Sequence, residues 1–97
     1  TKDMNMVKWT QEQAVAFECA RECITDMMGI CSGKIADEEG RAAPDSVRLA
    51  SLERELSELA RERASLTIHD DDKVAKIRSE YGSKIRQNRS QQHRQAA

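Results

Sequence analysis

Residues 49–66, LASLERELSELARERASL, decide the fold. Apolar residues recur there at spacings of three and four, which is the a/d pattern of a heptad repeat. Arg63 occupies the one a position that is not leucine. A narrow apolar stripe on a helix must be covered by another helix. We call this set the leucine seam and expect it to contact a second copy or a partner protein: Leu49, Leu52, Leu56, Leu59, Arg63 and Leu66.

The sequence on either side of the leucine seam predicts two further helices. With the seam helix, they cover residues near 10–39, 45–67 and 70–90. The chain is rich in good helix formers and contains a single proline, which favours helix over strand. The first helix has a broad apolar stripe, which indicates cover on more than one side. We therefore predict an all-α protein of three helices.

Local signals mark the ends of these helices. Thr10, followed three residues later by Gln13, matches a capping box at the start of the first helix. Gly40 suits the C-cap of that helix, and Asp45 offers an acceptor to the free amides of the second. Residues 70–72 are all aspartate, which suits the positive end of the third helix dipole.

The short break at residues 67–70 predicts that the second and third helices lie antiparallel, as a coiled-coil-like hairpin. In this hairpin the leucine seam faces the apolar stripe of the third helix. The first helix then packs on the hairpin or pairs with its own copy in a second subunit. The third-helix stripe consists of Val74, Ile77, Tyr81 and Ile85, and its first three residues complete the expected contact surface.

Few large side chains are available to build a core, since only three of the 97 residues are aromatic. A monomer of this size would bury a modest fraction of its surface. We therefore expect a homo-oligomer, most simply a homodimer. Arg63 either fixes the register or oligomeric state of the seam, or lies at its open end with its charge in water.

Length and composition predict one small domain, residues 1–97, with a frayed start at 1–8 and a basic polar tail at about 88–97. No apolar run approaches the ~20 residues of a membrane span, and the N-terminus lacks the apolar core of a signal peptide. Three cysteines are an odd set, which argues against a disulfide framework. We expect a cytoplasmic protein with no membrane partner, and the composition is typical of a bacterial accessory protein from a plasmid or phage.

Charge is distributed unevenly along the chain. Residues 1–72 hold nine Lys/Arg and sixteen Asp/Glu, whereas residues 73–97 hold seven Lys/Arg and one Glu. Such asymmetry indicates either pairing between the two ends or an anionic partner for the basic end. The isoelectric point of about 6.1 is low for a nucleic-acid-binding domain. Contacts to phosphates, if they form, are expected from Lys76, Lys84, Arg86 and Arg89.

Cys19 and Cys23 lie one turn apart on one side of the first helix. They could supply half of a zinc site, completed by Cys31, His69 or His93 or by ligands from a second subunit. Structural zinc sites usually take ligand pairs from C-x2-C or C-x4-C turns, and this spacing is neither. Because cysteine is among the most often buried residue types, we expect both thiols to be reduced, metal-free and buried.

No motif predicts catalysis or a cofactor, so we expect neither an enzyme nor a bound metal. His69 stands beside three aspartates, but acid–base catalysis would need a pocket and a reacting group, and helix capping explains the cluster. We predict a small helical protein–protein interaction module (an adaptor, inhibitor or antitoxin-like accessory protein) that presents a helix face to an unidentified protein. The alternative is a nucleic-acid-associated regulator that binds phosphates through the third helix and tail.

Overall fold

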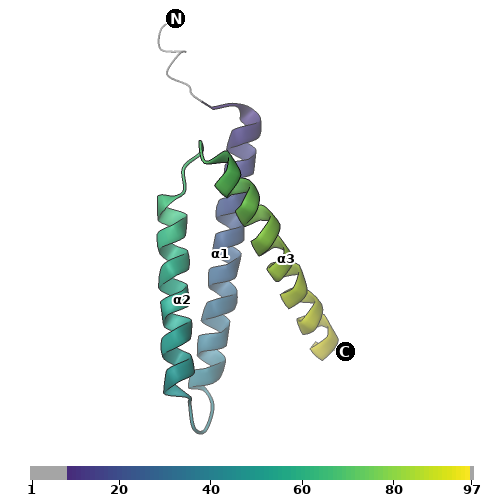
Figure 1. The fold of residues 1–97 in the computed structure, drawn as a ribbon. Coiled ribbons are helices and arrows are strands. Elements are labelled where there is room, and N and C mark those ends of the chain that lie inside the picture. Colours follow the sequence, from purple (N-terminus) through teal and green to yellow (C-terminus); the bar gives the residue numbers. More distant parts are fainter. Residues whose placement is uncertain (1–8, 97) are drawn as a thin grey trace, which may run out of the picture.

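A computed structural model describes residues 9–96, which form three α-helices: α1 (Gln11–Glu39), α2 (Ser46–Ser65) and α3 (Asp71–Ala96) (Figure 1). The described residues contain no strand. The prediction of an all-α chain with three helices is therefore confirmed. In this part of the chain no helix combines the length and apolar content that crossing a membrane requires.

The helix starts follow the predicted capping signals. The Gln13 N–H donates to Thr10 Oγ1 at 3.0 Å, and the Thr10 N–H donates to Gln13 Oε1 at 2.9 Å. These reciprocal bonds form the predicted capping box. Asp45 caps α2 by accepting from the amides of Val47 and Arg48 at 3.0 and 3.1 Å. Gly40 caps the end of α1, as predicted.

The third helix is longer than predicted. It continues past residue 90 to Ala96, so the predicted basic polar tail is helical as far as the structure describes it. Neither glycine nor proline follows Gly82, and arginine, glutamine, serine and alanine all tolerate a helix. The predicted frayed start, residues 1–8, lies outside the described residues.

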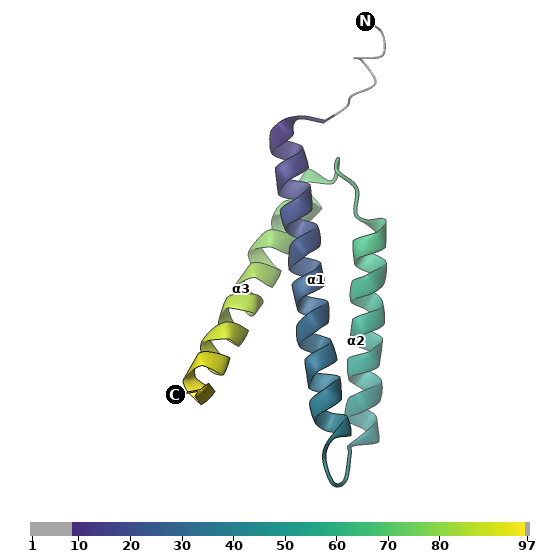
Figure 2. The same cartoon turned by 180° about the vertical axis from the view of Figure 1, so that it is seen from behind.

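The central helix is α1. It packs against both α2 and α3, whereas α2 and α3 make no close backbone contact within the described residues. Figures 1 and 2 show α1 and α2 side by side and antiparallel, while α3 crosses α1 near its N-terminal half and then diverges. The structure thus does not confirm the predicted hairpin of the second and third helices, because the hairpin is formed by α1 and α2.

The hydrophobic core follows the length of α1. Ala20 and Ile24 have no exposed surface, because neighbours cover α1 from two sides. Each helix contributes side chains to this core within one chain, although Val15 of α1 stays exposed, so the core residues themselves no longer require cover from a second copy. The homodimer stays a prediction. The core consists of Ala20, Ile24, Met27, Leu59, Leu66, Val74, Ile77 and Ile85.

The three cysteines lie in different environments. Cys31 is buried, and its thiol donates to the Leu52 carbonyl oxygen at 3.1 Å. Cys23 is half-buried, and burial together with the nearby Asp26 carboxylate raises the pKa of its thiol. Cys19 is exposed, so the prediction that it is buried is wrong. The reason is helical phase: Cys19 lies on the side of α1 that no other helix covers.

Candidate interaction surface

The residues predicted to form the contact seam lie inside the molecule. The leucine seam faces α1, since α1 is the helix whose backbone packs closely against α2. Leu52, Leu59 and Leu66 are buried, and so are Val74 and Ile77 of α3. The others, Leu49, Leu56, Arg63 and Tyr81, are half-buried. The buried side chains are closed to a partner and the half-buried ones offer only part of their surface, so the main surface for a partner must be sought elsewhere.

Two polar side chains of the predicted seam make contacts between helices. Arg63 Nη1 donates to Thr25 Oγ1 at 3.0 Å, which joins α2 to α1. Tyr81 OH donates to Glu62 Oε1 at 2.6 Å, which joins α3 to α2. Burial and this bond to a carboxylate raise the pKa of Tyr81 far above its usual range. Both contacts set the positions of helices within the chain.

Glu38, which the sequence analysis did not single out, is the buried charge of the structure. Its side chain is only 4% exposed, and it accepts from the Asp45 N–H at 2.9 Å. Arg41 and Arg48 each approach its Oε1 to 3.3 Å. The bond from the Asp45 amide and the Arg41 guanidinium lower the pKa of Glu38. This carboxylate holds the turn between α1 and α2 closed, so we assign it a structural role.

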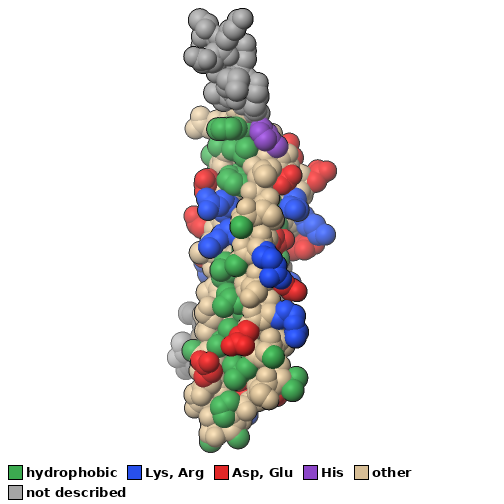
Figure 3. Space-filling view, turned by 90° about the vertical axis from the view of Figure 1, so that its left-hand side faces the viewer, with side chains coloured by type: hydrophobic (Ala, Val, Ile, Leu, Met, Phe, Trp, Pro, Cys, Tyr) green, Lys and Arg blue, Asp and Glu red, His purple; other side chains and the backbone are tan. Residues whose placement is uncertain are grey.

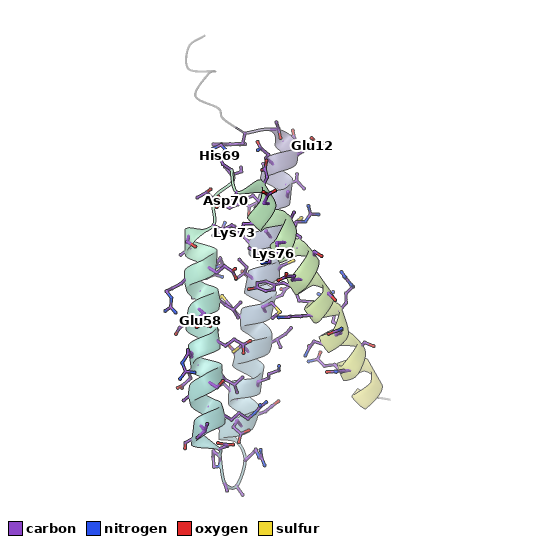
Figure 4. All side chains as sticks on the ribbon, viewed as in Figure 1. Glu12, Glu58, His69, Asp70, Lys73 and Lys76 are labelled. Carbon is purple, nitrogen blue, oxygen red and sulfur yellow. The ribbon has the colours of Figure 1, made fainter. Side chains whose placement is uncertain are left out.

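The predicted phosphate contacts are exposed but do not form one row. Lys76, Lys84, Arg86 and Arg89 are exposed on α3. At 100° per residue they spread around the helix instead of following one side. Lys84 Nζ lies 5.7 Å from the Tyr81 ring centroid, a cation–π distance. In Figure 4, Lys73 and Lys76 lie on the first turns of α3, so the basic surface runs along most of this helix.

A cleft of about 520 Å³ lies where α3 diverges from α1. Gly29 and Gly33 line it from α1, and no atom lies near the position of an added Cβ at either glycine. The cleft mixes acidic and basic side chains, including Asp26, Lys34 and Arg89. This mixture gives no preference for a ligand of either charge.

Two exposed apolar side chains lie together near the N-terminal end of α1. Among the described residues, three large hydrophobic side chains are exposed: Trp9 (46%), Val15 (55%) and Val47 (78%). Trp9 and Val15 line one shallow surface hollow, whereas Val47 lies apart on α2. We call the lining of this hollow the α1 patch: Trp9, Gln11, Ala14, Val15, Glu18, Cys19 and Glu22.

Local structure places the side chains of the α1 patch. Val15 and Cys19 are four residues apart, so they lie one above the other on an exposed side of α1. Trp9 precedes the N-cap, and its ring centroid lies 6.2 Å from that of His69 in the α2–α3 loop, within the range of aromatic pairs. Figure 3, viewed from the side of α2, shows hydrophobic side chains beside the histidine at this end.

The described residues bring together no group of three side chains of the kinds that hold a metal ion. His69 is exposed beside an aromatic ring, and Figure 4 places it at the end of the molecule where Glu12 and Asp70 also lie. Comparisons of the chain with protein-family models, with curated proteins and with solved structures found no match.

Proposed function

We propose that this protein is a small helical protein–protein interaction module, acting as an adaptor, inhibitor or antitoxin-like accessory protein, and that it binds its partner through the α1 patch. One observation carries the proposal. Trp9 and Val15 are exposed on the same surface, beside polar side chains. Exposed apolar patches with a polar rim mark interaction sites, and tryptophan is enriched among residues that dominate binding energy.

The position of the α1 patch also suits binding. It lies on the longest helix, whose opposite side is fixed in the core. A rigid, preformed surface loses little conformational freedom when a partner docks, which favours affinity. The small size of the patch predicts a transient contact rather than an obligate one.

Two valines provide a matched test of this proposal. Val15→Lys places a charge in the α1 patch, and Val47→Lys places the same charge on an exposed valine of α2. Tagged protein and both variants are used to capture partners from the native cell, with mass spectrometry to compare what is recovered. We expect a partner recovered with the parent and with Val47→Lys and lost with Val15→Lys. Equal recovery with all three would contradict the proposal.

The structure favours a second candidate function, nucleic-acid binding, through one specific observation. The distal half of α3 leaves the bundle (Figures 1 and 2), and no acidic residue follows Glu80. A projecting helix has the diameter that a DNA major groove admits. Arg86→Ala with Arg89→Ala would then abolish a gel shift seen at low salt, whereas Arg54→Ala with Arg61→Ala on α2 would not. An unchanged shift would reject this candidate.

A further inference from the structure

We propose that the segment that binds the α1 patch is a cationic amphipathic helix of another protein. This inference rests on the proposed function, since it names the chemistry of the partner at the same surface. Three properties of the α1 patch support it: its charge, the row in which its apolar side chains lie, and its poor match to any surface of a second copy.

Charge is the first property. Residues 11–26 of α1, which include the helical part of the patch, carry four acidic residues and one basic residue, and Glu18 and Glu22 line the patch itself. Arg21 is a basic residue on the same part of α1, and its Nη1 lies 3.6 Å from Glu18 Oε1. That ion pair is exposed on both sides, so water screens it and it offsets little of the negative potential. Lysine or arginine on a partner would find two carboxylates beside the apolar side chains.

The row of apolar side chains is the second property. Val15 and Cys19 follow the axis of α1 at a spacing of four, with Trp9 beyond the helix start. A helix that docks along such a row supplies its own apolar residues at spacings of three and four. The flanking Glu18 and Glu22 then face the positions that flank the partner's apolar stripe, as charged pairs do in coiled coils.

A second copy of the chain matches the α1 patch poorly. A twofold dimer through this surface would set the patch against itself and bring Glu18 and Glu22 of both copies together, which like charges disfavour. The basic C-terminal half of α3 from a second copy would pair with Glu18 and Glu22, but no large apolar residue follows Ile85 in that half. Trp9 and Val15 would therefore stay uncovered.

The only tryptophan of the chain lies in the α1 patch, so its fluorescence reports binding directly. The probe is a synthetic tryptophan-free helix of leucine and lysine, compared with helices of the same leucine pattern in which glutamate or glutamine replaces lysine. We expect the Leu/Lys helix alone to shift Trp9 emission to shorter wavelength in a saturable way. Its affinity should fall as salt is raised, because the flanking ion pairs are exposed.

Charge variants show which carboxylates contribute to binding of the Leu/Lys helix. Glu18→Gln with Glu22→Gln should weaken Leu/Lys binding about 2- to 30-fold, from ~0.2–1 kcal/mol for each exposed pair. Glu53→Gln with Glu58→Gln removes two exposed acids of α2, so the net charge changes equally. This control should leave binding unchanged. Equal weakening by both double variants would overturn the inference, because it would show a non-specific attraction.

The outcomes separate this inference from the proposed function. Equal binding of the glutamate or glutamine helix would refute a cationic partner and leave the α1 patch as a docking surface. Binding of no helix would also refute it, while the capture experiment with Val15→Lys decides the proposed function independently. A dimer that Val15→Lys dissociates and Val47→Lys does not would identify a second copy as the occupant and overturn the inference.

Discussion

Replacing Leu59 by alanine tests the packing of α2 on the central helix. Leu59 is 6% exposed and belongs to the core beside Ile24 and Met27 of α1. The lost burial costs about 2.4 kcal/mol, at ~0.8 kcal/mol for each carbon group removed. The remaining cavity adds a penalty of ~24 cal/mol per Å³ that does not collapse. Because the helices form an open arrangement that can relax, we expect a total of about 2.5–4 kcal/mol.

The expected loss is large against the ~5–15 kcal/mol by which domains are usually stable. At ~4–8 °C per kcal/mol, the melting temperature of Leu59→Ala should fall by about 10–30 °C. Circular dichroism at 222 nm, with urea and thermal unfolding, measures both quantities. Val47→Ala is the control, since Val47 is 78% exposed and its loss should cost within ~0.5 kcal/mol. Equal effects of the two substitutions would refute the packing of α2 on α1.

Three further predictions concern pH and assembly. Folding lowers the pKa of Glu38. The contribution of its carboxylate to the free energy of unfolding is therefore present above the unfolded-state pKa of ~4.3 and is lost as the pH falls through the folded-state pKa. Glu38→Gln should therefore flatten the acid limb of a stability–pH profile, and an unchanged limb would contradict the buried carboxylate. The pKa of Tyr81 is raised, so its contribution is present below the unfolded value of ~10 and is lost at higher pH. Tyr81→Phe should lower the free energy of unfolding by ~0.5–1.5 kcal/mol at pH 7 and remove the loss of stability at alkaline pH. Unfolding like that of the parent at pH 7 and at alkaline pH would count against the bond to Glu62. Light scattering tests the homodimer predicted from the sequence, which a mass near 11.0 kDa at tens of micromolar would refute.

Local features of the fold could be predicted from the sequence because they depend on residues close together in the chain. The Thr10–Gln13 capping box spans three residues, and Asp45 caps the two amides that follow it. Helix pairing could not be predicted in the same way. Every amphipathic stripe needs a cover, but spacing alone does not say which stripe covers which. The broad stripe of the first helix was the correct indication that it is central, whereas the short loop at 66–70 joins helices whose described backbones make no close contact.

The α1 patch was only partly visible in the sequence. The row of Phe17, Ala20 and Ile24 sets the core side of α1, and Val15 falls on the opposite side of the helix. That phase could have identified Val15 as exposed. Glu38 could not have been found, because its burial depends on how the turn after α1 brings the Asp45 amide and an arginine onto the carboxylate.

Alkylation of the three cysteines tests most directly the central claim, that one side of α1 is open and the other fixed in the core. In the folded protein, Cys19 should react with iodoacetamide first, Cys23 more slowly, and Cys31 only when the chain unfolds. Burial raises the pKa of the Cys23 and Cys31 thiols, which further reduces their reactive thiolate at neutral pH. Mass spectrometry of peptides at increasing times gives the order. Protection of Cys19, or reaction of Cys31 as fast as Cys19, would contradict this account of α1.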